Sequence, residues 1–288
     1  MRLFLPTLIL LLMASCQRSL PDTICQAWKF DGFNISPEYE EKLASAENES
    51  AREKFRQFLK NSGSVTETNW RFYPNGTCAM LSKYHYSVKR WELNESTGQL
   101  AIINGKTREF YQIERDGTNL TLSELTNKSV TKGHVSATLR PNPEYEEGSI
   151  DLLAPTRNEW RNKPLQPESF RAIQKRLIDQ LTYMIDYFEL TNKKKQTYFN
   201  TGHLNSPFQF YSGGMGLFNP NELPRTWVGQ FYDNGDALKA HNLLAGAFRS
   251  GLTFPHSEKT YTDAYARFLK QVKAFVLVQE EPKALPAQ

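Results

Sequence analysis

The sequence contains little of what marks metal-binding, nucleic-acid-binding and cofactor-dependent proteins. It has three cysteines and five histidines, and its formal net charge is +4. No two histidines have metal-ligand spacing on one predicted helix, which argues against a metal site. The basic residues are scattered apart from Lys193-Lys194-Lys195, which we interpret as a solvated helix end, so the sequence argues against a nucleic-acid partner. We therefore assign no metal, no cofactor and no nucleic-acid partner.

Complete catalytic motifs are lacking as well, so we predict a protein that is not an enzyme. Ser212-Gly213-Gly214 has the serine of a nucleophile turn, but the G-x-S-x-G elbow of hydrolases is absent. No catalytic residue is assigned. The remaining enzyme hypothesis is an unrecognised hydrolase that combines residues 206–232 with His203 or His241.

Long hydrophobic runs are also missing. No segment beyond the N-terminus has the run of about 18 or more apolar residues that predicts a membrane-spanning helix. Leu3–Met13 is a shorter apolar stretch that follows the basic Arg2. Such a stretch is typical of a signal peptide, which we place at residues 1–15. The sequence therefore predicts an exported protein.

The apolar stretch ends at Met13-Ala14-Ser15-Cys16, which resembles the lipobox of bacterial lipoproteins. The resemblance implies that Cys16 is lipidated and becomes the new N-terminus, so that residues 16–21 tether the protein to a membrane. It also implies the cell envelope of a Gram-negative bacterium, with the outer membrane as the expected membrane. The alternative is an ordinary signal peptide with a chance cysteine.

Two cysteines remain once Cys16 is assigned to the lipid. Cys25 and Cys78 could form a disulfide, because an exported compartment permits one. Whether the two side chains meet depends on their geometry, which the sequence does not give. The sequence therefore leaves two possibilities, a disulfide between Cys25 and Cys78 or two buried free thiols.

Residues 22–140 have the pattern of an antiparallel β-meander. Turn signals such as Asn104-Gly105 and Asp116-Gly117 recur between short runs of alternating apolar residues, which predicts hairpins. Strands that each have one apolar face bury those faces when the meander closes into a barrel. One helix, which begins at Ser36-Pro37-Glu38 and ends by Gly63, interrupts the meander. The predicted strands are 26–34, 64–73, 77–86, 88–94, 99–103, 106–115, 118–126 and 133–140.

Three motifs in this half carry a family resemblance. Cys25-Gln26-Ala27-Trp28-Lys29, Phe72-Tyr73-Pro74-Asn75-Gly76-Thr77 and Val88-Lys89-Arg90-Trp91-Glu92-Leu93 resemble the lipocalin-like domain of bacterial lipoproteins. The resemblance implies a barrel of about eight strands that encloses side chains or one small ligand. It also implies that Trp28 plugs the closed end and that the domain has no catalytic activity. The residues of the structural signature are Trp28, Phe72, Gly76 and Trp91.

The second half is predicted to be helical. Residues 141–167 are rich in proline and form a predicted linker, residues 168–280 a helical domain, and residues 281–288 a flexible tail. Apolar residues spaced by three and four predict helices over 168–191, 234–250 and 260–278. On the second of these helices, Leu238 and Leu244 are expected to face inward.

Residues 206–232, between the first two of these helices, are rich in aromatic side chains and in Gly, Pro and Asn. Exposed aromatic rings on loops bind sugars or peptides well. Buried rings fill the space between helices, and we favour this second interpretation because three helices alone make a thin core. The aromatic residues that could contact a ligand or a partner are Phe208, Phe210, Tyr211, Trp227 and Phe231.

These patterns predict an α+β protein of two domains, an antiparallel lipocalin-like β-barrel with one inserted helix followed by a mainly α-helical domain. The predicted function is that of a lipid-anchored cell-envelope protein that binds a small apolar or glycan-type ligand. The alternative is a structural module that docks another envelope protein.

Overall fold

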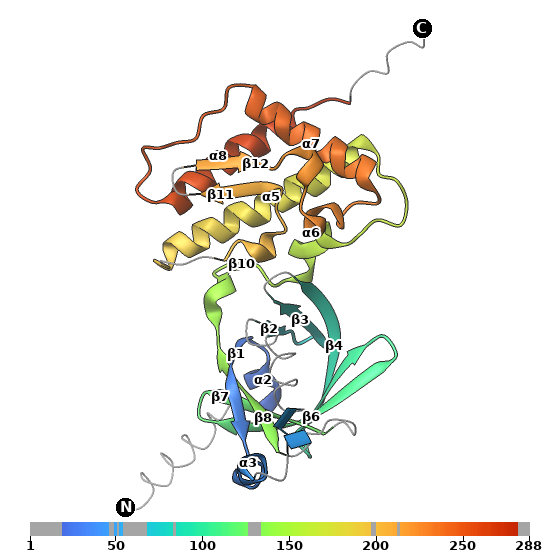
Figure 1. The fold of residues 1–288 in the computed structure, drawn as a ribbon, viewed down its shortest axis with the longest axis vertical. Coiled ribbons are helices and arrows are strands. Elements are labelled where there is room, and N and C mark those ends of the chain that lie inside the picture. The colour runs from blue at the N-terminus through green and yellow to red at the C-terminus, as the bar shows by residue number, and fades with distance from the viewer. Residues whose placement is uncertain are drawn as a thin grey trace, which may run out of the picture. The chain divides into compact units, whose positions relative to one another are not determined.

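The computed structural model describes residues 19–45, 49–50, 52–53, 68–82, 85–125, 134–196, 200–211 and 214–281. The chain divides into two compact units, which Figure 1 shows as a ribbon. The first runs to Cys78 and continues over Val88–Pro141, and the second contains Ala79–Ser87 and Asn142–Gln288. The predicted signal peptide, its Cys16 and the serine Ser212 lie outside the described residues.

Most of the first unit is a closed antiparallel barrel. Eight strands follow one another in sequence order around it, and β8 returns to pair with β1. Closure leaves no sheet edge exposed. The predicted barrel and the predicted α+β class are therefore confirmed. The elements are α2 (Leu20–Ile24), β1 (Ala27–Ile35), α3 (Pro37–Ala44), β2 (Asn69–Phe72), β3 (Thr77–Leu81), β4 (Tyr86–Asn94), β5 (Gln99–Asn104), β6 (Thr107–Asp116), β7 (Asn119–Glu124) and β8 (Val135–Pro141).

Glycines with positive φ make the tight turns between strands. Gly76 has φ +77° and donates its N–H to the Tyr73 carbonyl at 3.1 Å, which closes the turn between β2 and β3. Gly98 has φ +67°, and a Cβ at this position would lie 3.2 Å from the Ile113 carbonyl oxygen. Residues with a side chain rarely adopt such φ values. The turns that the sequence marks with glycine thus need glycine because the backbone there has a positive φ.

Large aromatic side chains pack together around β1, β2 and β4. Trp28 on β1 lies opposite Trp70 on β2, and both are buried, Trp28 completely. Phe72 is also buried and lies edge-on to Trp91, with their ring centroids 5.6 Å apart. Nε1 of Trp28 donates to the Ile24 carbonyl at 2.9 Å, which ties β1 to the end of α2. These contacts make Trp28 a packing residue.

The two remaining cysteines are free thiols, so no disulfide joins Cys25 to Cys78 in the structure. Cys78 is fully buried on β3, and burial raises its pKa to about 12. Cys25 is partly buried after α2, and burial raises its pKa as well. Both groups are therefore protonated at neutral pH and behave as small apolar side chains.

The inserted helix begins where the sequence places it. Ser36 caps α3, and its Oγ accepts a hydrogen bond from the Tyr39 N–H at 3.3 Å. Tyr39 is buried, and its ring stacks on that of His134 at a centroid distance of 4.9 Å. α3 ends at Ala44, and most of the predicted continuation toward Gly63 lies outside the described residues.

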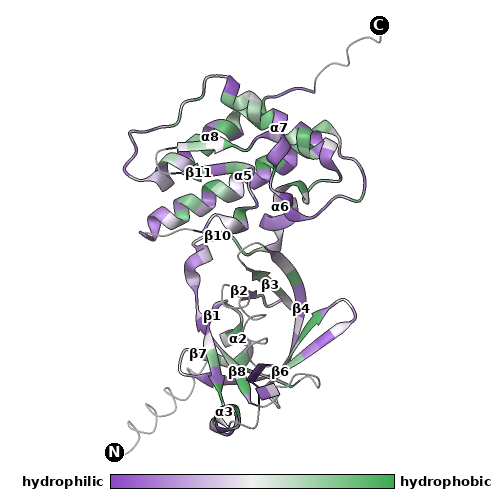
Figure 2. Cartoon of the chain, in the orientation of Figure 1, coloured by the Kyte–Doolittle hydropathy of each residue, from purple (hydrophilic) through white to green (hydrophobic). Residues whose placement is uncertain are grey.

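The second unit is mainly helical. Its three long helices lie within a few residues of the predicted ranges. Figure 2 shows hydrophobic and hydrophilic residues side by side along α5 and α7, as expected for helices with one buried face. Within the described ranges, none of the helices combines the length and the apolar character that crossing a membrane requires. The elements are η2 (Pro143–Tyr145), β9 (Glu146–Glu147), β10 (Ile150–Asp151), η3 (Pro155–Arg161), α5 (Phe170–Lys193), η4 (Gly202–Leu204), β11 (Phe208–Tyr211), β12 (Gly214–Leu217), η5 (Pro220–Glu222), α6 (Arg225–Val228), α7 (Asn234–Arg249) and α8 (Tyr261–Leu277), where η marks a 3-10 helix.

The proline-rich segment after the barrel packs against α5 within the second unit. Leu153 and Trp160 of this segment are almost completely buried. Arg176 of α5 donates to the Trp160 carbonyl at 2.6 Å and forms an ion pair with Glu168 at 2.8 Å. The segment that the sequence presents as a linker therefore contributes side chains to the core of the helical unit.

Replacing Trp28 by alanine is expected to destabilise the barrel strongly. Loss of a large buried side chain and the resulting cavity typically lower the free energy of unfolding by about 3–5 kcal/mol. Whole domains have only about 5–15 kcal/mol, so thermal unfolding of the full chain, followed by circular dichroism, should show the barrel transition at a much lower temperature. Val88→Ala on β4, whose side chain is 46% exposed, is the control and should change little. An unchanged transition for Trp28→Ala would contradict the packing role.

Candidate functional site

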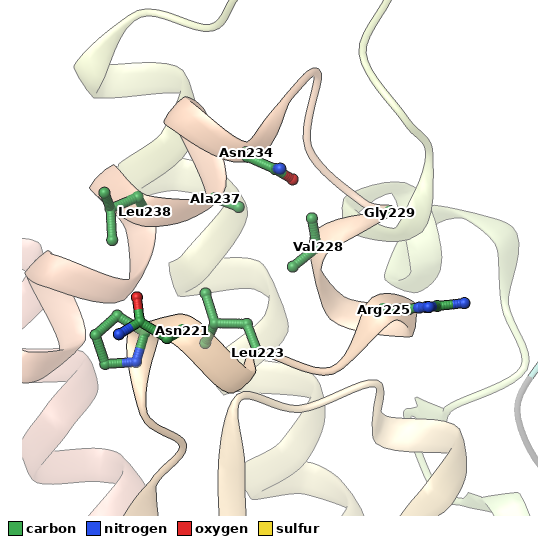
Figure 3. Close-up of a pocket in the computed structure, with 9 residues that line it drawn as sticks. Asn221, Leu223, Arg225, Val228, Gly229, Asn234, Ala237 and Leu238 are labelled. Carbon is green, nitrogen blue, oxygen red and sulfur yellow. The ribbon is translucent and has the colours of Figure 1, made fainter.

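The second unit contains a cavity of about 490 Å³ between η5, α6 and the start of α7. Its volume falls within the range of about 300–1,000 Å³ that is typical of small-molecule sites. We call it the 220–238 cavity, and Figure 3 shows its lining. The lining residues are Pro220, Asn221, Leu223, Arg225, Val228, Gly229, Asn234, Ala237 and Leu238.

Aliphatic side chains form the walls of this cavity, and amides lie at its polar positions. In Figure 3, Leu223 and Val228 point into the space between η5 and α6, whereas Arg225 points away from it. Asn221 and Asn234 are exposed lining residues and bring side-chain amides, which both donate and accept hydrogen bonds. The lining therefore suits an apolar ligand that carries a few neutral hydrogen-bonding groups.

The start of α7 is already neutralised by acidic side chains. Asp233 caps the helix and accepts a hydrogen bond from the Asp236 N–H at 2.9 Å. The buried carboxylate of Asp236 accepts from the Glu168 N–H at 2.9 Å and from Lys239 at 2.8 Å. Burial opposes ionisation of Asp236, but these hydrogen bonds hold its pKa below the ordinary value. The positive end of the helix dipole is thus occupied by side chains of the protein itself.

The aromatic residues predicted as ligand contacts do not line this cavity. Trp227 and Phe231 are fully buried, with their ring centroids 4.8 Å apart, and Nε1 of Trp227 donates to Oε1 of Gln180 at 3.2 Å. Phe208 is buried as well. These rings fill the interior next to the cavity, in agreement with the interpretation that irregular segments use aromatic residues to complete a thin core.

Two further aromatic residues of this segment lie on the hairpin β11–β12. Phe210 is partly buried and packs against Phe188 and Tyr265, at centroid distances of 5.3 and 5.2 Å. Tyr211 is 54% exposed, and its carbonyl accepts a hydrogen bond from the Tyr265 hydroxyl at 2.7 Å. Its ring lies over Gly214, where a Cβ would come within 2.7 Å of it. Tyr211 is thus the one predicted contact residue that is exposed.

The sequence did not identify Leu223, Val228 or Leu238 as residues that line a cavity. Leu238 was expected to face inward, but its side chain is 43% exposed. The buried face of α7 consists instead of Ala237, Ala240, Leu244 and Ala247, which repeat at intervals of three and four. Small alanines on that face bring α7 close to its neighbours, and the neighbouring Leu238 is turned outward. The alanine repeat was the signal that could have placed Leu238 correctly.

The two histidines of the hydrolase hypothesis are both buried and do not line the cavity. Nε2 of His241 lies 2.9 Å from the Phe218 carbonyl oxygen. His203 is surrounded by tyrosine rings, and burial together with the charge of Arg161 lowers its pKa to about 3. In the described part of the chain, no group of three or more His, Cys, Asp or Glu side chains is arranged to hold a metal ion.

No family model matches the chain, and no curated protein matches it. Among solved structures, the chain is similar to the crystal structure of a DUF4847 family protein from Bacteroides vulgatus ATCC 8482 at 1.00 Å resolution. The sequence identity is 12%, the match covers 42% of this chain and 94% of that chain, and the TM-score is 0.27. This likeness is too weak to support a statement about function.

Because His203 is buried in its neutral form, the protein is expected to lose stability in mild acid. Its pKa is about 3 in the folded protein against an ordinary value of 6.5. As the pH falls from 6.5 toward 3, the unfolded chain therefore takes up a proton that the folded protein does not bind. The free energy of unfolding should fall by up to about 1.4 kcal/mol per pH unit over this window and should not change from this cause above it.

Urea unfolding between pH 7 and pH 4 measures this effect. Carboxylates also titrate at the acid end, so the informative quantity is the difference between the wild type and His203→Phe, which keeps an aromatic ring at this position. The variant should show the shallower pH dependence. Equal slopes in the two proteins would show that His203 does not resist protonation.

Proposed function

We propose that this protein is a lipid-anchored protein of the bacterial cell envelope that binds a small apolar or glycan-type ligand and catalyses no reaction. The 220–238 cavity is the proposed binding site. The main support for this proposal is the aliphatic lining of the cavity, because Leu223, Val228 and Leu238 present apolar surface to solvent at a concave site. The same lining has no aromatic ring for a sugar to stack on, which favours the apolar alternative.

The barrel supports this proposal as a scaffold. Its strands bury large side chains such as Trp28, Phe72 and Leu100, each at most 1% exposed. Side chains that are this well packed favour a structural role for these positions over ligand contact. The lipid anchor at Cys16 follows from the resemblance to the lipobox alone. Each part of the proposal therefore needs its own test.

Cys16→Ser tests the anchor. Serine cannot form the thioether that holds the lipid, so the variant, expressed in a Gram-negative host, should lose incorporation of a labelled fatty acid and its membrane association. Cys25→Ser changes the next cysteine along the chain and should keep both properties. Labelling of Cys16→Ser at the wild-type level would rule out lipidation at this residue.

Leu238→Glu tests the binding site. Leu238 is 43% exposed, so a charge at this position should leave the fold intact while it makes the cavity wall polar. Binding of the apolar fluorescent probe N-phenyl-1-naphthylamine should weaken by about tenfold or more, which corresponds to about 1.4 kcal/mol. Displacement of the probe by a neutral trisaccharide would identify the glycan alternative.

Leu165→Glu provides the matched control. Leu165 is 97% exposed and does not line the cavity, so the same substitution there should leave binding of the probe unchanged. Equal affinities of Leu238→Glu and Leu165→Glu for the probe would place its site elsewhere. Absence of binding to the wild-type protein would argue against a small apolar ligand and favour the interaction module.

A further inference from the structure

The loop between α7 and α8 forms another cavity in the second unit. The loop covers residues 250–260, and the cavity has a volume of about 340 Å³. This volume also falls within the range of about 300–1,000 Å³ that is typical of small-molecule sites. We call it the 254–264 cavity. Its lining residues are Phe254, Pro255, His256, Glu258, Lys259, Thr260, Tyr261 and Ala264.

Three of these lining residues have ring side chains with flat faces. Phe254 is partly buried, and its ring lies edge to face with that of His256 at a centroid distance of 5.4 Å. His256 is exposed, and Tyr261, the first residue of α8, is 53% exposed. An exposed tyrosine offers a ligand an apolar ring face and a hydroxyl that stays in water. The 254–264 cavity therefore has the aromatic surface that the 220–238 cavity lacks.

Polar groups occupy other positions of the same lining. Glu258 brings a carboxylate and Lys259 an ammonium group, so the lining both accepts and donates hydrogen bonds. Glu258 forms an ion pair with Arg267 of α8, but its side chain is 24% exposed, and a carboxylate has about four acceptor sites. Acceptor capacity therefore remains at Glu258. The single acid and the single lysine of this lining have opposite charges, which favours a neutral ligand over an ion.

Contacts with the helices hold the loop in place. Phe254 packs against the buried rings of Tyr265 and Phe268 on α8, at centroid distances of 5.6 and 5.8 Å. At the other end of the loop, Thr260 caps α8, and its Oγ1 lies 3.2 Å from Oδ1 of Asn192 on α5. A site that is supported in this way keeps its shape before a ligand binds, which lowers the entropic cost of binding.

We propose that the 254–264 cavity binds a neutral saccharide, with a sugar ring stacked on Tyr261 and sugar hydroxyls hydrogen-bonded to Glu258 and Lys259. A sugar ring has apolar C–H faces and a rim of hydroxyls, so it needs a flat ring together with donors and acceptors at its edge. An apolar ligand suits this lining less well, because Pro255 and Ala264 are its only aliphatic residues. The two cavities share no lining residue, so this site is additional to the proposed ligand site and does not rest on it.

Isothermal titration calorimetry of the full chain with maltotriose, cellotriose and triacetylchitotriose tests the proposal. These neutral trisaccharides differ in linkage and in N-acetylation but share the ring faces and hydroxyls that the site would recognise. At least one of them should bind with a heat signal that saturates. Leu238→Glu changes only the 220–238 cavity and should bind this saccharide with unchanged affinity. Absence of binding by all three saccharides, or loss of binding in Leu238→Glu, would overturn the proposal.

Tyr261→Ala removes the proposed stacking ring. Because Tyr261 is 53% exposed, the fold should remain intact, which an unchanged melting temperature checks. The affinity for the saccharide should fall by about tenfold or more, as is usual when an aromatic anchor is truncated. Tyr261→Phe keeps the ring and should retain most of the affinity.

Tyr232→Ala provides the matched control. Tyr232 is 37% exposed and lines neither cavity, so its loss should leave the affinity for the saccharide unchanged. Equal affinities of Tyr261→Ala and Tyr232→Ala would contradict the assignment of the stacking ring.

Crystals of the wild-type protein soaked in the saccharide that binds give a direct check. Electron density for a sugar ring against Tyr261 and within hydrogen-bond distance of Glu258 would support the site. A saccharide found only in the 220–238 cavity or elsewhere on the chain would overturn it.

Discussion

The second unit depends on one long helix whose buried polar side chains must find partners in the segments around it. Gln174 and Gln180 of α5 are both almost fully buried. Nε2 of Gln174 donates to the Val276 carbonyl at 2.6 Å, at the end of α8. Nε2 of Gln180 donates to the Asn205 carbonyl at 3.0 Å. A buried amide without such bonds destabilises a protein by about 1–3 kcal/mol, so these contacts restrict where α8 and the segment after η4 can lie.

The position of the 220–238 cavity follows from the same helix. Oε1 of Gln180 accepts from Nε1 of Trp227, which fixes α6 and therefore the neighbouring Val228 on the cavity wall. The other wall begins at α7, where the carboxylate of Asp236 binds the N–H of Glu168 just before α5 starts. Both walls are thus held by buried hydrogen bonds to α5 or to the residues that precede it. Sites on well-supported elements keep their geometry better than sites on free loops.

Local patterns predicted the elements of this protein well, because strands and helices are decided largely by short-range periodicity. The alternating runs and glycine turns gave the eight strands, and apolar spacing gave α5, α7 and α8. The cavity could not be predicted in the same way. Its walls combine residues around Leu223 with residues around Leu238, and only the packing of α6 against α7 brings these together. Trp227 was predicted to contact a ligand because it is aromatic. However, it is fully buried, so the surface of the cavity is formed by its aliphatic neighbours.

The burial of His203 was beyond prediction for a related reason. Nothing in the local pattern around His203 distinguishes a buried histidine from an exposed one, because η4 is covered only where it packs against α5. The His203 ring lies edge to face with those of Tyr183 and Tyr187 on that helix, at centroid distances of 6.2 and 4.6 Å. Gln180 and Tyr183 lie three residues apart and therefore share one face of α5. That face binds Nε1 of Trp227 next to the cavity and also packs against His203, so a proton taken up by His203 in acid would weaken the packing of the helix on which the cavity wall rests.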